Sequence, residues 1–240
     1  MAACVRMRVT ANATLSMPAQ TAAHNYDVAG AINRWGWVVH GNPPPGGLAD
    51  DLPLQWLVTT LDHALRRYVT EEASAPLRML LPQLLINVSR QYRQIWGQRE
   101  ESPVASLAVV RIEDDQVEYG VFGDCFILVE DGVSGKERWL RPGEPARFEA
   151  DHRVPLWFSA SRGILRPKSH ALAMVLASRS LEEVWREAGG EASGHALLAA
   201  LRQEGLHPLV GRLVRAWPES RPRPALACTY LRVDPVPTPW

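Results

Sequence analysis

Three side chains at the ends of apolar stretches could do chemistry: Asp27, His40 and Arg162. Asp27 offers a carboxylate that could be a ligand or a catalytic group, unless it only caps a turn at the start of its strand. His40 could accept a proton or bind a soft metal through its imidazole, or form a structural hydrogen bond at a strand end. Arg162 precedes Gly163 and could bind an anion, or make a salt bridge at the surface. These residue types point to acid/base chemistry or anion binding and leave the structural alternatives open.

Aromatic and turn residues supply further candidates. The chain has nine Trp in 240 residues, and Trp35 and Trp37 precede the histidine in its apolar stretch. They could line a ligand pocket by stacking, although packing in the core is the more common role of such rings. Asp124, in a Gly-Asp turn, is a further candidate ligand-binding residue. Cys125 has no His near it in the sequence to lower its pKa, so we interpret it as a small buried residue.

The spacing of apolar residues predicts the elements that must position these groups. The predicted strands cover residues 4–9, 27–32, 36–40, 104–112, 116–122, 125–129, 137–140, 154–160 and 225–233. The predicted helices cover residues 54–69, 82–96, 170–177, 181–188 and 196–216, the last with a break at 205–208. Residues 116–132 are interpreted as a β-hairpin with its tight turn at Gly123-Asp124. Pro82 is placed in the first turn of its helix, where a missing N–H costs least.

This order of elements predicts the architecture. Strands, two helices, more strands, more helices and one closing strand fit two antiparallel sheets with helices on both outer faces. We therefore expect an α+β fold, a four-layer α-β-β-α sandwich. No linker divides the chain, so we expect one domain over residues 1–234 and a Pro-rich tail over 235–240.

The composition limits partners and compartment. Lys+Arg and Asp+Glu both number 26, so the net charge is zero and no overall field attracts nucleic acid or an anionic membrane. Three Cys are too few for a disulfide framework, and residues 1–9 lack the apolar core of a signal peptide. We expect a cytoplasmic protein with neither nucleic acid nor a membrane as partner.

The segments in this order resemble the metal-dependent protein phosphatases of the PP2C (PPM) family. VASLAVVRI and VEYGVFGDCFILVEDG, within residues 104–132, are similar to the family's Ser/Thr-Ala strand, Gly-Asp-Ser turn and strand ending in Asp-Gly, with Cys125 in place of Ser. Asn25-Tyr26-Asp27 resembles the family's Asn-Glu-Asp, and WVVHG at 37–41 resembles its strand ending in a metal-binding Asp-Gly. LWFSASRG at 156–163 resembles its strand ending in Ser-Asp-Gly, and 225–233 resembles its closing strand. The resemblance implies the same α-β-β-α sandwich.

The resemblance also shows which family ligands are missing. It implies two divalent cations, held by carboxylates from four motifs, that activate a bridging water for attack on a phosphoryl group. Asp27 remains. The other positions hold Tyr26, His40, Arg162 and the run Arg221-Pro222-Arg223-Pro224. Hard cations need several oxygen ligands, so we expect no metal or at most one Mg²⁺ or Mn²⁺ ion, with Asp27 and Gly41 as ligands.

These departures predict a PP2C-like domain that binds or regulates, a pseudophosphatase-type module whose partner is an unknown protein or a small anionic ligand. Two alternatives stay open: a residual metal-dependent phosphatase that uses Asp27, His40 and Gly41, and an enzyme of another class in the emptied cleft. The expected catalytic set is Asp27, His40 and Arg162, and the expected ligand-binding set is Trp35, Trp37, Asp124 and Arg162.

Overall fold

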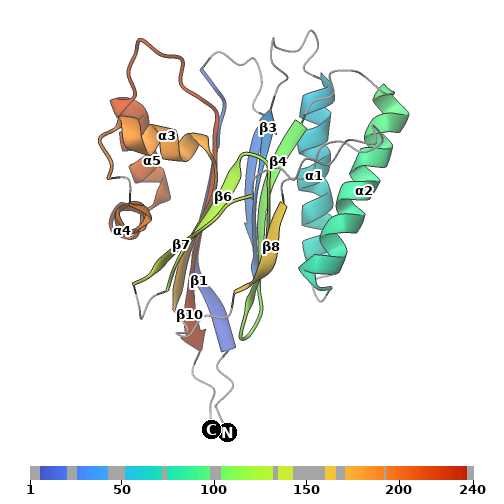
Figure 1. Ribbon diagram of the computed structural model, residues 1–240, viewed down its shortest axis with the longest axis horizontal. Helices are drawn as coiled ribbons and strands as arrows, with labels where there is room; N and C mark the ends of the chain where they lie inside the picture. Colours follow the sequence, from blue (N-terminus) through green and yellow to red (C-terminus); the bar gives the residue numbers. More distant parts are fainter. Residues whose placement is uncertain are drawn as a thin grey trace, which may run out of the picture.

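The structure is a computed structural model that describes residues 6–20, 26–42, 52–71, 75–97, 104–131, 135–142, 160–165, 171–191 and 193–236. Two antiparallel five-stranded sheets lie face to face, as Figure 1 shows. The first sheet has the order β1 (Arg6–Met17), β10 (Leu226–Val236), β9 (Leu172–Ser178), β6 (Cys125–Asp131) and β7 (Glu137–Leu140). The second has the order β2 (Asp27–Ile32), β3 (Trp35–Asn42), β4 (Val104–Ile112), β5 (Val117–Phe122) and β8 (Ala160–Leu165).

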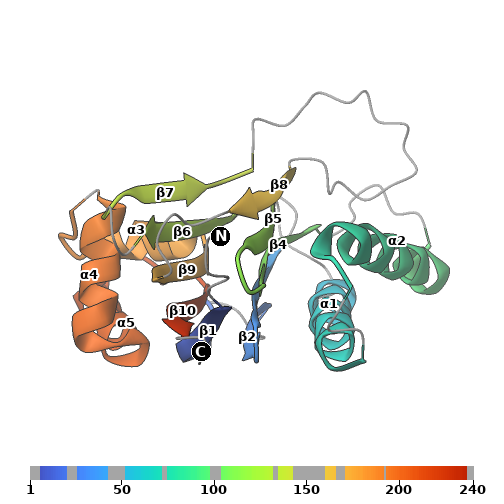
Figure 2. The same cartoon turned by 90° about the horizontal axis from the view of Figure 1, so that it is seen from below.

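Helices cover both outer faces of this pair of sheets, as Figure 2 shows from below. The second sheet is covered by α1 (Leu52–Glu71) and α2 (Leu77–Trp96). The first is covered by α3 (Ser180–Glu187), α4 (Gly194–Glu204) and α5 (Leu206–Ala216). The expected α-β-β-α sandwich is confirmed.

Three apolar cores hold the four layers together. One lies between α1, α2 and the second sheet, one between the two sheets, and one between the first sheet and α3 to α5. The strands of the second sheet alternate between the first two cores: Trp35, Trp37 and Val39 face the helices, whereas Val38 faces the other sheet. Period-2 alternation thus decides which side chains of β3 lie on which side of the sheet.

The predicted hairpin over residues 116–132 is wrong, although both of its strands exist. β5 pairs with β4 and β8 in the second sheet, whereas β6 pairs with β9 and β7 in the first. The turn at Gly123-Asp124 therefore carries the chain from one sheet to the other. Gly123 has a φ of 62°, and a Cβ there would lie 2.3 Å from the Ser106 hydroxyl oxygen, so glycine is required at this crossing. A tight-turn sequence has the same composition whether it joins paired strands or separate sheets.

The helix predicted over residues 170–177 is also wrong, because this segment is the central strand β9. All seven of its residues are buried, since it lies between β10 and β6 and is covered on both faces. Two-sided burial removes the alternation that marks a strand, and a short apolar run is then ambiguous.

Two boundaries differ most from the prediction. Helix α2 begins at Leu77, so Pro82 lies inside the helix instead of in its first turn. β1 extends from Arg6 to Met17, well beyond the predicted end at residue 9, because it pairs with β10 along nearly its whole length. The strand predicted over residues 154–160 falls mostly outside the described residues.

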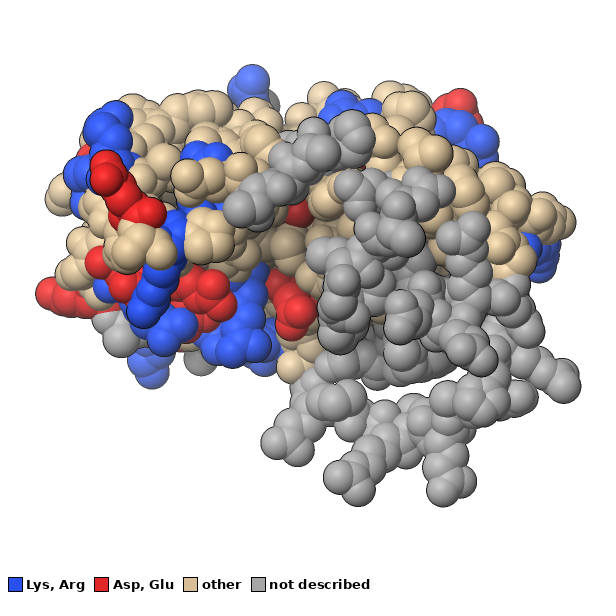
Figure 3. Space-filling model, turned by 90° about the horizontal axis from the view of Figure 1, so that it is seen from above, with Lys and Arg blue, Asp and Glu red and all other residues tan. Residues whose placement is uncertain are grey.

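Surface and helix composition add two observations. Among the described residues, no helix combines the length and apolar content that crossing a membrane requires. On the face drawn in Figure 3, Lys and Arg side chains lie beside Asp and Glu side chains. The described part of this face therefore lacks an extended field of one sign.

Candidate functional site

Asp27 and His40 form a buried pair in the second sheet. Asp27 is the first residue of β2, and the register of β2 and β3 places it directly across from His40. His40 Nδ1 and Asp27 Oδ1 are 2.7 Å apart. The Asp27 side chain is fully enclosed, and that of His40 is 14% exposed. A carboxylate buried this deeply needs hydrogen bonding and positive charge from a partner, and His40 can supply both.

Other polar groups surround this pair. Ser106 on β4 lies across from His40, is fully buried, and accepts hydrogen bonds from Asn42 Nδ2 at 2.7 Å and from the backbone N–H of Asp124 at 2.8 Å. Ser106 thus fixes both the end of β3 and the turn that crosses between the sheets. Five polar residues from β2, β3, β4 and this turn form one cluster on the side of the sheet that faces the other sheet. We call these residues the Asp27–His40 cluster: Asp27, His40, Asn42, Ser106 and Asp124.

The carboxylates of the cluster shift the pKa of His40 and of the neighbouring residue Cys125. Burial disfavours a charged imidazole, but the hydrogen bond and negative charge of Asp27, helped by Asp124 and Asn42, raise the pKa of His40 above its ordinary value. Burial and the charges of the same two carboxylates raise the pKa of the Cys125 thiol well above its ordinary value. His40 is therefore poised to carry a positive charge beside Asp27, whereas Cys125 stays a thiol and is a poor nucleophile.

The residues that the structure describes do not form a centre for two divalent cations. Within the described part of the chain, no group of three or more His, Cys, Asp or Glu side chains is arranged to hold a metal ion. The Asp27 carboxylate is engaged by a side chain that competes with a cation for the same charge. Arg221, in the segment that replaces the family's closing acidic pair, is an exposed partner of Glu187 on α3, with 2.9 Å between Arg221 Nη1 and Glu187 Oε1.

Gly41 has a structural reason to be glycine. Its N–H donates to the Tyr26 carbonyl at 2.8 Å, and a Cβ at Gly41 would lie 2.8 Å from Tyr26 Cβ. The backbones of the two strands approach each other so closely here that a side chain has no space. The glycine that the resemblance assigns to metal binding is thus accounted for by packing, and its role as a ligand stays a prediction.

Arg162 does not join the Asp27–His40 cluster. Arg162 lies inside β8 and pairs with Gly120 on β5, which pairs with Val109 on β4. Val109 in turn pairs with Trp37 on β3, and Trp37 is three residues before His40. The Cα atoms of Arg162 and His40 are therefore roughly 17 Å apart, because three inter-strand spacings and three residues along a strand lie between them. An offset of three residues also reverses the face, so Arg162 belongs to the helix-covered side and His40 to the side between the sheets.

The two tryptophans proposed to line a pocket are core residues. Trp37 is completely buried, and its Nε1–H donates to Asp62 Oδ1 on α1 at 2.8 Å. Trp35 is 2% exposed, although its ring edges a cavity on the helix side and lies 5.6 Å from the guanidinium carbon of Arg111. Both face α1 and α2, so neither contributes to the cluster between the sheets.

The sequence analysis missed Ser106 and Asn42. The available signal was a single serine in the otherwise apolar strand 104–112, at a position that a neighbouring strand could place beside His40. Recognising it requires the register of β3 against β4, which depends on segments separated by both α1 and α2.

Comparison with known proteins supports the fold alone. No family model and no curated protein match the sequence. Among solved structures, the serine/threonine phosphatase from S. agalactiae is 13% identical to this chain, with a TM-score of 0.63. The alignment covers 94% of this chain and 98% of the phosphatase chain. The catalytic domain of the serine/threonine phosphatase PstP, in complex with two manganese ions, is 12% identical with a TM-score of 0.59, covering 97% and 100%. The PPM phosphatase MsPP from Mycobacterium smegmatis is 13% identical with a TM-score of 0.57, covering 93% and 98%. The chain therefore has the PP2C-like fold.

Proposed function

We propose that this chain, which has the fold of the PP2C phosphatases, acts by binding and does not hydrolyse phosphoesters. The observation that carries the proposal is the Asp27–His40 pair, with 2.7 Å between His40 Nδ1 and Asp27 Oδ1 and no exposure of the carboxylate. In this pair a protonated imidazole is the counter-ion of Asp27, the one carboxylate that remains at the positions where the resemblance implies metal ligands.

The electrostatics of the pair oppose metal binding. A protonated His40 neutralises Asp27, so the net negative charge that draws a divalent cation is removed. A cation would have to displace His40 from a buried hydrogen bond, and the imidazolium would repel the cation until it lost its proton. Asp124 is exposed and adds one carboxylate, which falls short of the several oxygen ligands that Mg²⁺ and Mn²⁺ need.

The test measures metal binding and hydrolysis together. The purified chain is titrated with Mn²⁺ and Mg²⁺ by calorimetry, and hydrolysis of p-nitrophenyl phosphate and of a phosphothreonine peptide is followed with each ion. We expect no saturable binding and no metal-dependent hydrolysis above the protein-free blank. Hydrolysis that depends on Mn²⁺ and disappears in Asp27→Ala would refute the proposal and support a residual phosphatase.

A gain-of-binding variant tests the reason. His40→Asp replaces the counter-ion by a second carboxylate next to Asp27, and we expect it to bind Mn²⁺ more tightly than the parent chain. His63→Asp is the matched control, because His63 is an exposed histidine on α1, away from the cluster. If both variants bind Mn²⁺ as weakly as the parent, competition by His40 is not the cause.

A further inference from the structure

An open apolar groove lies on the helix side of the second sheet, between α2 and the strands β5 and β8. It encloses about 780 Å³, which is within the size range of small-molecule sites. Its apolar walls include Leu77, Leu81, Leu85, Tyr119, Phe122 and Ile164. Met79 and Ile164 also line it and remain 60% and 45% exposed, so large apolar side chains at its rim face water.

The groove lies at the edge of the second sheet, beside the strand that α2 contacts. β8 is the edge strand, and α2 packs over β5, its neighbour. Arg162 on β8 lies directly across from Gly120 on β5, and Leu81 packs so closely on Gly120 that a Cβ there would be 2.7 Å from Leu81 Cδ2. Leu81 therefore occupies the space above Gly120, and Arg162 on the edge strand lies beside it in the lining of the groove.

Two guanidinium groups line this groove and have no counter-ion among the described residues. Arg78, on the first turn of α2, and Arg162 both line it, and neither forms an ion pair or hydrogen bond with a described residue. Among the described residues of the lining, Glu118 is the one carboxylate, and its Oε2 accepts hydrogen bonds from Arg111 at 3.2 Å and from the Leu77 N–H at 2.7 Å.

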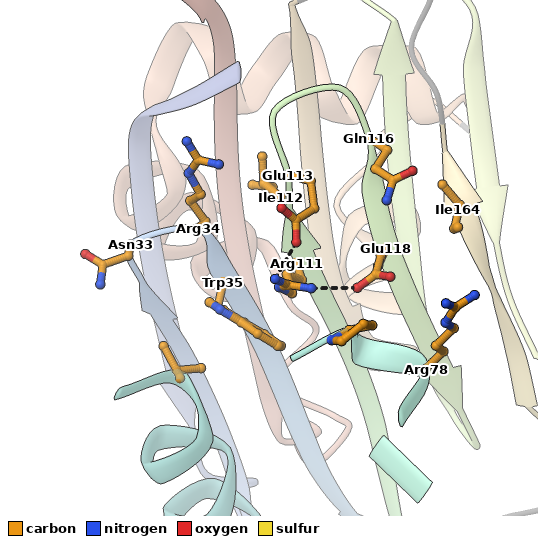
Figure 4. Close-up of a pocket in the computed structure, with 12 residues that line it drawn as sticks. Asn33, Arg34, Trp35, Arg78, Arg111, Ile112, Glu113, Gln116, Glu118 and Ile164 are labelled. Atoms are coloured by element: carbon orange, nitrogen blue, oxygen red, sulfur yellow. Dashed lines mark hydrogen bonds and ion pairs between the residues drawn. The ribbon is translucent and has the colours of Figure 1, made fainter. Parts of the chain in front are cut away.

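Figure 4 shows the neighbouring cavity, which shares Arg78, Glu118 and Ile164 with the groove. The Arg111 guanidinium lies between Glu113 and Glu118 and is linked to both. This triad carries one net negative charge, whereas Arg78 and Arg162 carry two positive charges. The lining is therefore positive at its rim and apolar along its walls.

We propose that the groove binds an amphipathic organic carboxylate, with the alkyl or aryl body along the wall of α2 and the carboxylate at Arg162 and Arg78. Guanidinium groups recognise carboxylates through paired, charge-assisted hydrogen bonds, and the apolar body covers the exposed rim. The site is on the opposite face of the sheet from the Asp27–His40 cluster. Ligand binding in the groove therefore does not depend on whether the Asp27–His40 cluster supports phosphatase activity.

Calorimetry with decanoate, butanoate and 1-decanol separates the two parts of this recognition. We expect decanoate to bind saturably with a Kd on the order of 10–100 µM, because a ligand of this size with one charged group reaches that range. Shortening the chain to butanoate should weaken binding by roughly fourfold for each methylene removed. 1-Decanol, which has the chain without the charge, should bind at least about fivefold more weakly than decanoate.

Variants locate the site. Arg162→Gln and Arg78→Gln should each weaken decanoate binding by roughly fivefold to tenfold, and Ile164→Glu should abolish it by adding a competing carboxylate at the exposed rim. Arg90→Gln is the matched control, because Arg90 is an exposed arginine of the same helix and does not line the groove. The far-ultraviolet circular dichroism of each variant should match that of the parent.

Three results would overturn the assignment. The first is the absence of saturable decanoate binding up to about 1 mM, well above the expected Kd. The second is equal binding of decanoate and 1-decanol, which would remove the role of the charge. The third is decanoate binding by Arg162→Gln and Ile164→Glu that is as strong as binding by the control Arg90→Gln. That result would place the ligand elsewhere.

Discussion

Replacing Asp27 by Asn tests whether the buried pair stabilises the fold through charge. The substitution keeps the shape of the side chain but leaves His40, whose side chain is 14% exposed, without its counter-ion. Two unit charges about 4 Å apart attract by about 4 kcal/mol at an effective dielectric constant of about 20. Removing one partner of a buried pair typically costs about 3–5 kcal/mol. Because water reaches part of His40, we expect a loss of about 2–3 kcal/mol in the free energy of unfolding.

The loss depends on pH in a direction that the pKa of His40 fixes. That pKa is raised in the folded state above the 6.5 of an unperturbed histidine. Stabilisation by the charged form is therefore fully present below about pH 6.5 and is lost as the pH rises through the folded-state pKa. The difference between the parent and Asp27→Asn should be largest near pH 5.5 and smaller at pH 9, where the hydrogen bond to a neutral imidazole remains.

Urea unfolding at pH 5.5, 7 and 9 measures this difference, and the histidine resonances of the folded protein report the titration of His40. For a chain of this length, 2–3 kcal/mol corresponds to a fall in Tm of roughly 5–10 °C. Asp114→Asn is the matched control, because Asp114 is 41% exposed and pairs with an exposed guanidinium, that of Arg34. We expect the control to cost less than about 1 kcal/mol at every pH. An Asp27→Asn cost that is the same at pH 5.5 and pH 9 would refute the charge argument.

Three further predictions test other buried groups. Trp37→Phe should lower the free energy of unfolding, measured in urea, by about 2–3 kcal/mol. The reason is that the substitution removes the indole N–H that donates to Asp62 Oδ1 at 2.8 Å. Glu118→Gln should cost about 1–3 kcal/mol in the same assay, because it removes the charge that pairs with buried Arg111. Cys125, whose thiol pKa burial raises, should react with iodoacetamide in the native protein far more slowly than in urea, as mass spectrometry would show.

Matched variants keep these three tests specific. Trp217→Phe removes a half-buried indole that donates to the Arg221 carbonyl at 3.0 Å, and we expect it to cost less than Trp37→Phe. Glu183→Gln changes an exposed acid on α3 and should cost less than about 1 kcal/mol. Equal costs at the buried and exposed sites would contradict the argument from burial. Rapid alkylation of Cys125 in the native protein would show that its surroundings open far more often than this packing allows.

The fold was largely predictable because most segments carry their own pattern. Helix α1 shows apolar residues at helical spacing, and the break in the last helical stretch falls at Gly205, where α4 ends and α5 begins. The strands predicted over residues 27–32 and 36–40 form β2 and β3, and Asn33 in the turn between them adopts a positive φ of 52°. These signals are local, so a window of a few residues contains them.

The candidate site was predictable only in part. Asp27 and His40 were selected from their positions at the ends of two strands that a short turn joins, and the structure brings them together. Arg162 was placed at a strand end near them, but β8 runs from Ala160 to Leu165 and holds it on the opposite face of the sheet. A one-residue change in where a strand begins reverses the face of every side chain, and no local feature of the sequence fixes that start.

The amino-acid sequence by itself determined the layers of this protein and the loss of acidic residues from the positions where the resemblance expects them, because apolar periodicity and residue identity belong to each segment alone. The tertiary structure decided that β5 and β6 join different sheets, that His40 pairs with Asp27, and that Arg162 borders an apolar groove beside α2. Those outcomes depend on pairing between segments distant in the chain, where register and burial are set by the contacts of the whole molecule.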